Sequence, residues 1–371
     1  MTIGVILLAV VCLAYANGAN DNFKGVATLF GSGTANYRNA LVWATVTTLL
    51  GSLTAVLLAG ALLKNFSGKG LVGEDLVSQP DFVAAVALGA GLTVLLATQI
   101  GMPISTTHGL IGALVGAGLA AGSAVNVGKL AGDFFLPLLL SPVIAVVVTS
   151  IVYLVAHAAR KSLGITTQSC FCVGAEVIEV APLMEGAAVV RRIETLTAQV
   201  GNAVTCRSRY RAQLFGIQFG PLFDQLHYLS AGAVSFARGL NDTPKIAALL
   251  LIVPVLGNFG STTLVGLAIA MGGLLSARRV AEMMSQKITP MNHGQGFTAN
   301  LVTSLVVIGA SLIGKPVSTT HVSCGALFGI GAITGQAKWG TILTILIAWV
   351  TTLPVGVLLG AACYRVLAAL S

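Results

Sequence analysis

The sequence predicts an all-α polytopic membrane protein that is built from two repeats with broken helices. The first observation behind this prediction is composition. Of the 371 residues, 56% are hydrophobic and only 9% are charged, with a mean hydropathy of +0.91, so there are too few charges to cover a water-soluble surface. The second observation is a duplication: residues 101–108 (Gly-Met-Pro-Ile-Ser-Thr-Thr-His) recur nearly unchanged at 314–321, 213 residues later. The 44 glycines fit closely packed membrane helices, because small residues let helix backbones approach.

The first half, residues 1–159, is predicted to form the first transmembrane repeat. Its expected segments are a short helix at 2–16, a polar break at 17–22, spans at 39–63 and 82–100 separated by a polar loop, a helix at 105–121 and a span at 134–159. The first run is short for a span of roughly 20 residues and lacks a cleavage site after a basic start, so we expect a mature helix. Pro103 disfavours helical geometry in the residue before it, and Ser105 is the expected N-cap of the next helix.

Residues 160–225 are predicted to form a polar cytoplasmic connector. They carry seven basic and five acidic residues, and the excess of arginine places them in the cytoplasm by the positive-inside bias. Residues 171–180 and 187–193 are rich in β-prone side chains and are expected to pair as a small hairpin. The Cys170-Phe171-Cys172 element lacks a convincing set of four metal ligands, so we expect reduced thiols there.

The second half, residues 226–371, is predicted to form the second transmembrane repeat. Its expected apolar segments are 226–237, 246–256, 262–275, 297–313, 318–333 and 339–370, with a break at Asn241-Asp242 after the first of them. The last stretch is long enough for one tilted helix or for two segments joined by a turn at residues 351–354.

Two acidic elements are the sharpest functional signals. Asn20-Asp21 is followed by Lys24, and Asn241-Asp242 is followed by Lys245 at the same spacing. A carboxylate within a membrane segment costs several kcal/mol unless a cation or another partner neutralises it. The oxygens of these Asn and Asp side chains suit a hard cation, and we predict Na⁺ at Asp21 and at Asp242. The alternative is an internal Asp-Lys pair that stabilises a helix break.

The two Ser-Thr-Thr elements indicate an anion. A Pro-x-Ser-Thr-Thr helix start presents unpaired backbone N–H groups, hydroxyl donors and the positive end of a helix dipole. The predicted anion-binding residues are Ser105, Thr106, Thr107, Ser318, Thr319 and Thr320. The alternative is that these residues only cap two helices. His108 and His321 follow a turn later, and we expect each to be a hydrogen-bonded packing residue.

An anion site and a cation site built from broken helices in a duplicated membrane chain are typical of a secondary transporter with inverted repeats. The chain has no Gly-x-x-x-x-Gly-Lys-[Ser/Thr] element, so a pump driven by ATP is not supported. An intramembrane serine hydrolase is disfavoured, because the serines are helix caps in two copies, and we expect no enzyme. A passive anion channel remains an alternative. The net charge of +8 is explained by basic loops that face anionic lipid, and we expect no nucleic-acid partner.

The paired motifs resemble those of the inorganic phosphate transporter family, the cation-coupled phosphate permeases. The resemblance is carried by Gly-Ala-Asn-Asp at 18–21, Gly-Leu-Asn-Asp at 239–242 and the two Pro-x-Ser-Thr-Thr-His elements, and it covers both halves. It implies import of phosphate by symport with Na⁺ or H⁺, phosphate between the two Ser-Thr-Thr starts and Na⁺ at Asn20, Asp21, Asn241 and Asp242. It also implies inverted repeats, re-entrant helical hairpins, a homodimer in the cell (inner) membrane, and no cofactor beyond the coupling ion.

The chain departs from the family pattern at three positions. Arg238 stands where a histidine is common, Pro244 stands where a glutamine precedes the lysine, and Lys24 stands where an asparagine is usual. The extra positive charge beside Asp21 could displace a cation. Both the coupling ion and a related oxyanion such as sulfate therefore stay open.

Overall fold

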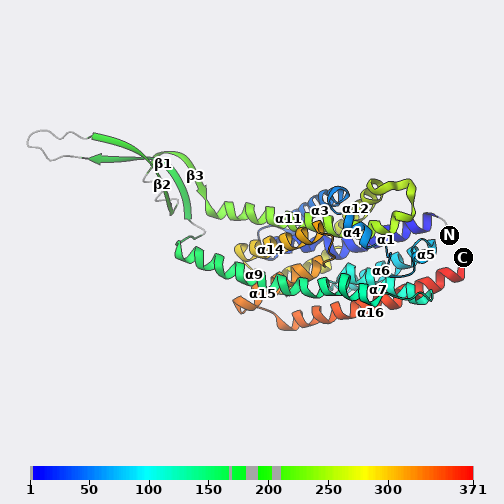
Figure 1. Cartoon of the computed structure of the whole chain (residues 1–371). Helices are drawn as coiled ribbons and strands as arrows, with labels where there is room; N and C mark the ends of the chain where they lie inside the picture. The colour runs from blue at the N-terminus through cyan, green and yellow to red at the C-terminus, as the bar shows by residue number, and fades with distance from the viewer. Residues whose placement is uncertain (1–2, 167–168, 181–190, 203–209, 371) are drawn as a thin grey trace, which may run out of the picture. The chain divides into compact units, whose positions relative to one another are not determined.

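The computed structural model describes residues 3–166, 169–180, 191–202 and 210–370. The chain divides into two compact units, one formed by Met1–Tyr153 with His227–Ser371 and the other by Leu154–Leu226. The first unit is helical and contains both pairs of motifs (Figure 1). Seven helices among the described residues are long and apolar enough to cross a membrane. The all-α polytopic membrane fold is thereby confirmed.

The first half follows the expected order of helices. Its main helices are α1 (Ile3–Asp21), α3 (Tyr37–Leu58), α4 (Gly60–Asn65), α6 (Pro80–Gln99), α7 (Thr106–Ala120) and α9 (Leu136–Ser162). Shorter elements connect them: η1 (Asn22–Val26), α2 (Ala27–Gly31), α5 (Glu74–Val77), α8 (Val127–Lys129) and η2 (Leu130–Phe135). Local sequence explains several starts. Asn36 accepts a hydrogen bond from the backbone of Asn39, and Pro80 occupies the first turn of α6, where its missing N–H costs nothing.

The second half begins within a long helix and ends with another. Its helices are α11 (Phe219–Ala247), α12 (Gly257–Ser276), α13 (Arg278–Glu282), α14 (His293–Leu312), α15 (Thr319–Thr334) and α16 (Trp339–Leu370), with η3 (Ala248–Ile252), η4 (Pro254–Leu256) and η5 (Met283–Lys287) as shorter turns. Helix α16 runs unbroken through Pro354, so the chain adopts a single helix rather than a turn at 351–354.

The predicted breaks at the two Asn-Asp elements are wrong in position. Helix α1 continues to Asp21, and α11 continues through Asn241 and Asp242 to Ala247. Asn and Asp side chains disrupt helices when they bond to their own backbone. Here the amide of Asn20 donates to Thr98 and to the carbonyl of Met102 instead, so the helix keeps its own hydrogen bonds. In both halves the chain changes to 3₁₀ geometry only after the Asn-Asp element.

The two Ser-Thr-Thr helices begin with the same backbone geometry. Gly101 and Gly314 have φ angles of 73° and 70°, a left-handed conformation that favours glycine. Ser105 and Ser318 then cap α7 and α15 with φ of −92° in both cases and ψ of 112° and 113°. The predicted cap at Ser105 is confirmed. The Gly101 turn lies against the backbone of Arg279, whereas the Gly314 carbonyl accepts a hydrogen bond from Asn65. Different helices, α13 and α4, therefore support the two starts, and the inverted orientation of the repeats stays a prediction.

The second unit contains a three-stranded antiparallel sheet in the order β2-β1-β3. Strand β1 (Ser169–Val180) pairs with β2 (Arg191–Asn202) and with β3 (Tyr210–Gln218). The expected pairing of 171–180 with 187–193 is confirmed for residues 191–193, where Ile178 lies opposite Ile193. Residues 187–190 lie outside the described residues. Strand β3 was not expected, because its sequence carries no clear alternation.

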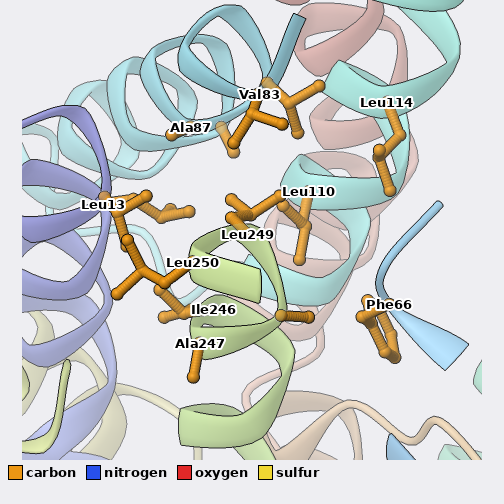
Figure 2. Packing of buried hydrophobic residues seen from close by; sticks show 14 of the residues in the cluster. Leu13, Phe66, Val83, Ala87, Leu110, Leu114, Ile246, Ala247, Leu249 and Leu250 are labelled. Atoms are coloured by element: carbon orange, nitrogen blue, oxygen red, sulfur yellow. The ribbon is translucent and has the colours of Figure 1, made fainter. Parts of the chain in front are cut away.

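A hydrophobic core surrounds the segment that follows α11. Figure 2 shows that Leu249 and Leu250, at the start of η3, lie between Leu13 of α1 and Leu110 of α7. All four side chains are nearly completely buried. Lys245 stands directly before this apolar segment, so the core packs beside the site described below.

Glycines allow α1 and α12 to pack with their backbones in contact. A Cβ atom added at Gly18 would collide with the carbonyl oxygen of Ile269, and one added at Gly272 would collide with that of Tyr15. This small-residue packing brings the Asn-Asp end of α1 close to the second half of the chain.

We predict that Gly272→Ala destabilises the protein by about 1 to 3 kcal/mol, because the added methyl group forces the two helices apart. The measurement is the thermal unfolding midpoint in detergent. Gly309→Ala in α14 is the matched control, since nothing lies near its added Cβ. Equal unfolding midpoints for the two variants would show that the close contact of α1 with α12 at Gly272 does not contribute to stability.

Candidate functional site

The two aspartates lie deep inside the first unit. Asp21 is the last residue of α1 and is 1% exposed, and Asp242 lies in α11 and is 5% exposed. Buried carboxylates in a membrane protein need charge partners. Each of these two has a lysine three residues later on its own chain segment, and a shared arginine.

Lys24 is surrounded by oxygen atoms from both halves of the chain. Its Nζ forms an ion pair with Asp21 and donates to Asn20 Oδ1 at 2.8 Å. It also donates to the carbonyl oxygen of Ile104 at 2.9 Å and to Thr320 Oγ1 at 2.6 Å. The ammonium group is therefore bound by a carboxylate, an amide, a backbone carbonyl and a hydroxyl.

Lys245 has a closely related set of contacts. Its Nζ lies 3.4 Å from Asp242 Oδ1, 2.8 Å from the carbonyl oxygen of Val317 and 3.0 Å from Thr107 Oγ1. Val317 follows Pro316 as Ile104 follows Pro103 in the first element. Each lysine thus contacts two groups. One is the carbonyl that precedes the Ser-Thr-Thr element of its own half, and the other is a threonine of the Ser-Thr-Thr element in the opposite half.

The predicted anion-binding residues meet at these charges. Thr106 Oγ1 donates to Asp21 at 3.1 Å, and Thr319 Oγ1 donates to Asp242 at 3.2 Å. Ser105 and Ser318 accept hydrogen bonds from the backbones of the histidines three residues later and so act as caps. Thr107 and Thr320 are the two threonines that accept from the lysines. Both helix starts therefore converge on one buried cluster.

The four predicted cation-binding residues lie in the same cluster. Asn20, Asp21 and Asp242 direct side-chain oxygens at the lysines, while the side-chain oxygen of Asn241 accepts from Ser311 at 3.3 Å. The Asn241 amide donates to Asp242 and to the Val317 carbonyl. The structure thus contains the Asp-Lys pairs that were the alternative to Na⁺ binding.

Arg238 joins the two halves and was not expected as a site residue. Its NH1 donates to the backbone oxygen of Asp21, and its NH2 lies 3.7 Å from Asp21 Oδ2 and 3.8 Å from Asp242 Oδ2. The side chain is fully buried. The sequence signal was present, because an arginine four residues before Asp242 falls on the same face of a helix.

The cluster has an excess of positive charge. Lys24, Lys245 and Arg238 carry three formal positive charges, and Asp21 and Asp242 carry two negative ones. The first N–H groups of α7 and α15 add the positive ends of two helix dipoles. An anion at this place would therefore be stabilised by both charge and hydrogen-bond donors.

The two histidines pack beside the cluster. The rings of His108 and His321 lie 4.7 Å apart, and the His321 ring stacks on Trp349 with centroids 3.8 Å apart. Trp349 donates from Nε1 to the carbonyl of Pro103. Among the described residues, His108 Nδ1 and both ring nitrogens of His321 have no hydrogen-bond partner. The expectation that these histidines are packing residues is confirmed.

The chain matches the model of the phosphate transporter family over residues 17–360. It is 29% identical to a probable low-affinity inorganic phosphate transporter of Bacillus subtilis and 28% identical to one of Rhizobium meliloti. Each alignment covers 98% of this chain and 96% of the relative. The fold also matches a solved structure of a sodium-dependent phosphate transporter with a TM-score of 0.76 and 20% identity over the full length of both chains.

We predict that Arg238→Gln lowers stability by about 1 to 3 kcal/mol, because it removes a buried guanidinium that hydrogen-bonds to the Asp21 backbone oxygen and lies within 4 Å of both aspartates, while each aspartate keeps its lysine. Thermal unfolding in detergent measures the effect. Arg278→Gln is the control, since Arg278 is 79% exposed and its surface pair with Glu282 is worth at most about 1 kcal/mol. Similar midpoints for the two variants would contradict the role given to Arg238.

Proposed function

Because the chain belongs to the phosphate transporter family, we propose that it imports inorganic phosphate across the cell (inner) membrane by symport with a cation, Na⁺ or H⁺. The single observation that carries the proposal is the convergence of two Ser-Thr-Thr helix starts on one buried cluster with an excess of positive charge. As the resemblance to the family implies, the protein would act as a homodimer with inverted repeats.

Phosphate would bind between the starts of α7 and α15. Its oxygens would accept hydrogen bonds from the backbone N–H groups and hydroxyls of the two elements. The threonine hydroxyls now bond to Asp21, Asp242 and the two lysines. Phosphate would exchange these internal contacts for contacts to itself, and the lysines and Arg238 would balance its charge.

The cation would act at the Asn-Asp elements. Asn20, Asp21, Asn241 and Asp242 carry the oxygens that a coupling cation requires, and they lie within the same cluster as the proposed anion site. A cation that binds close to phosphate lowers the cost of moving a negative charge through the membrane. This proximity supports coupled transport of the two ions.

Two alternatives are separable by experiment. Sulfate has a similar shape and could use the same donors, and a passive anion channel could also use paired helix starts. The burial of the cluster favours a carrier, because Asp21, Arg238 and Lys245 are each at most 5% exposed whereas an open channel needs a continuous path for water.

The experiment that tests the proposal is radiolabelled phosphate uptake into proteoliposomes with an imposed cation gradient. We expect phosphate to accumulate above its equilibrium level, arsenate to compete for uptake, and sulfate to compete weakly. A channel would only equilibrate phosphate. Uptake of radiolabelled sulfate without uptake of phosphate would assign the chain to the other oxyanion.

We predict that Thr107→Val and Thr320→Val each raise the phosphate concentration needed for half-maximal uptake. Losing a hydrogen bond to a charged group costs on the order of 1.5 to 3 kcal/mol, or roughly ten- to a hundred-fold in affinity. Thr93→Val is the matched control, because Thr93 is also buried and its hydroxyl bonds only to its own helix. Unchanged phosphate affinity in both site variants would show that the Ser-Thr-Thr elements only cap helices.

A further inference from the structure

We infer that the ammonium groups of Lys24 and Lys245 are built-in cations that take the place of Na⁺, so that phosphate transport by this chain does not require Na⁺. The inference rests on the proposed function, because it concerns the ion that accompanies phosphate. It goes further in naming two lysines as the residues that decide cation specificity.

The first argument for the inference is the set of contacts that Lys24 makes. An ammonium group has three N–H donors, and Lys24 Nζ already has four oxygen partners at hydrogen-bond distance. These partners are a carboxylate, an amide, a main-chain carbonyl and a hydroxyl, which are hard oxygen donors of the kind that bind metal cations. The ammonium group therefore fills the position that the oxygens would offer to a metal ion.

Lys245 repeats this arrangement with three oxygens. Its partners are again a carboxylate, the carbonyl that precedes a Ser-Thr-Thr element and a threonine hydroxyl from the opposite half. A local ion pair with Asp242 would need only the spacing of three residues on one helix. The additional contacts to Val317 and Thr107 place the ammonium group where the two halves meet.

The second argument for the inference is the formal charge of the cluster. The cluster already has three formal positive charges against two negative ones, and all five side chains are buried. A Na⁺ ion added here would lie beside ammonium and guanidinium groups in a medium of low dielectric constant, where like charges repel strongly. A phosphate monoanion would instead bring the formal charge to zero. The cluster is suited to phosphate without a metal ion.

The test is phosphate uptake into proteoliposomes with either Na⁺ or choline outside, under the same imposed pH gradient. We expect wild-type uptake to be the same in the two salts within about twofold. Lys24→Asn removes the ammonium group and leaves its oxygen partners in place, so Na⁺ should stimulate uptake by this variant at least about tenfold. Lys24→Met is the matched variant, because its side chain fills the space without supplying oxygen, and Na⁺ should have no effect on it.

A second readout is the thermal unfolding midpoint in NaCl and in choline chloride. A bound ion stabilises the folded state, so NaCl should raise the midpoint of Lys24→Asn and leave the wild-type midpoint unchanged. Wild-type uptake that falls tenfold without Na⁺ would overturn the inference and leave phosphate transport intact. Absence of wild-type uptake under every gradient would instead overturn the proposed function.

The variants decide the assignment of the individual lysines. If folded Lys24→Asn and the equivalent Lys245→Asn both lack a response to Na⁺ in uptake and in unfolding, the lysines do not occupy cation sites. If neither variant folds, the wild-type comparison of Na⁺ with choline in the two assays decides the inference.

Discussion

The burial of two carboxylates inside a membrane protein is the constraint on which the rest of the site depends. Asp21 and Asp242 have almost no access to water, and lipid offers them no hydrogen bonds. Their charge must be balanced by the chain itself. Two lysines, one arginine and the threonine hydroxyls of two helix starts meet this need, and in doing so they bring four separate segments of the sequence to one place.

The contacts between the halves connect charge balance to transport. Lys24 bonds to Thr320, and Lys245 bonds to Thr107, so each lysine contacts the helix start of the other half. A carrier that exposes its site alternately must break and remake such contacts as the halves move. In the proposed site, the oxygens of phosphate would replace the hydroxyls as partners for the lysines. Under this proposal, binding of phosphate and release of the contacts between the halves would involve the same hydrogen bonds.

The sequence predicted the features that local patterns encode. Composition predicted the membrane fold, and Pro103 with Ser105 predicted the start of α7, because a proline and a cap act on their immediate neighbours. The continuation of α11 through Asn241 was not predictable, since its amide bonds to Val317, 76 positions away. The contact of each lysine with the opposite half was missed for the same reason. Spacing revealed the Asp-Lys pairs and could not reveal which distant oxygens complete them.

The duplication is not exact, and the difference between the two copies determines the formal net charge of the cluster. Arg238 and Asn17 each precede the aspartate of their half by four residues on a helix. Asn17 donates a neutral hydrogen bond to Asp21 at 2.9 Å, whereas Arg238 lies within 4 Å of both aspartates. With asparagine at both places, two lysines would balance two aspartates and the formal charge would be zero. The arginine supplies the one unbalanced positive charge, so the preference of the cluster for an anion arises where the two repeats differ.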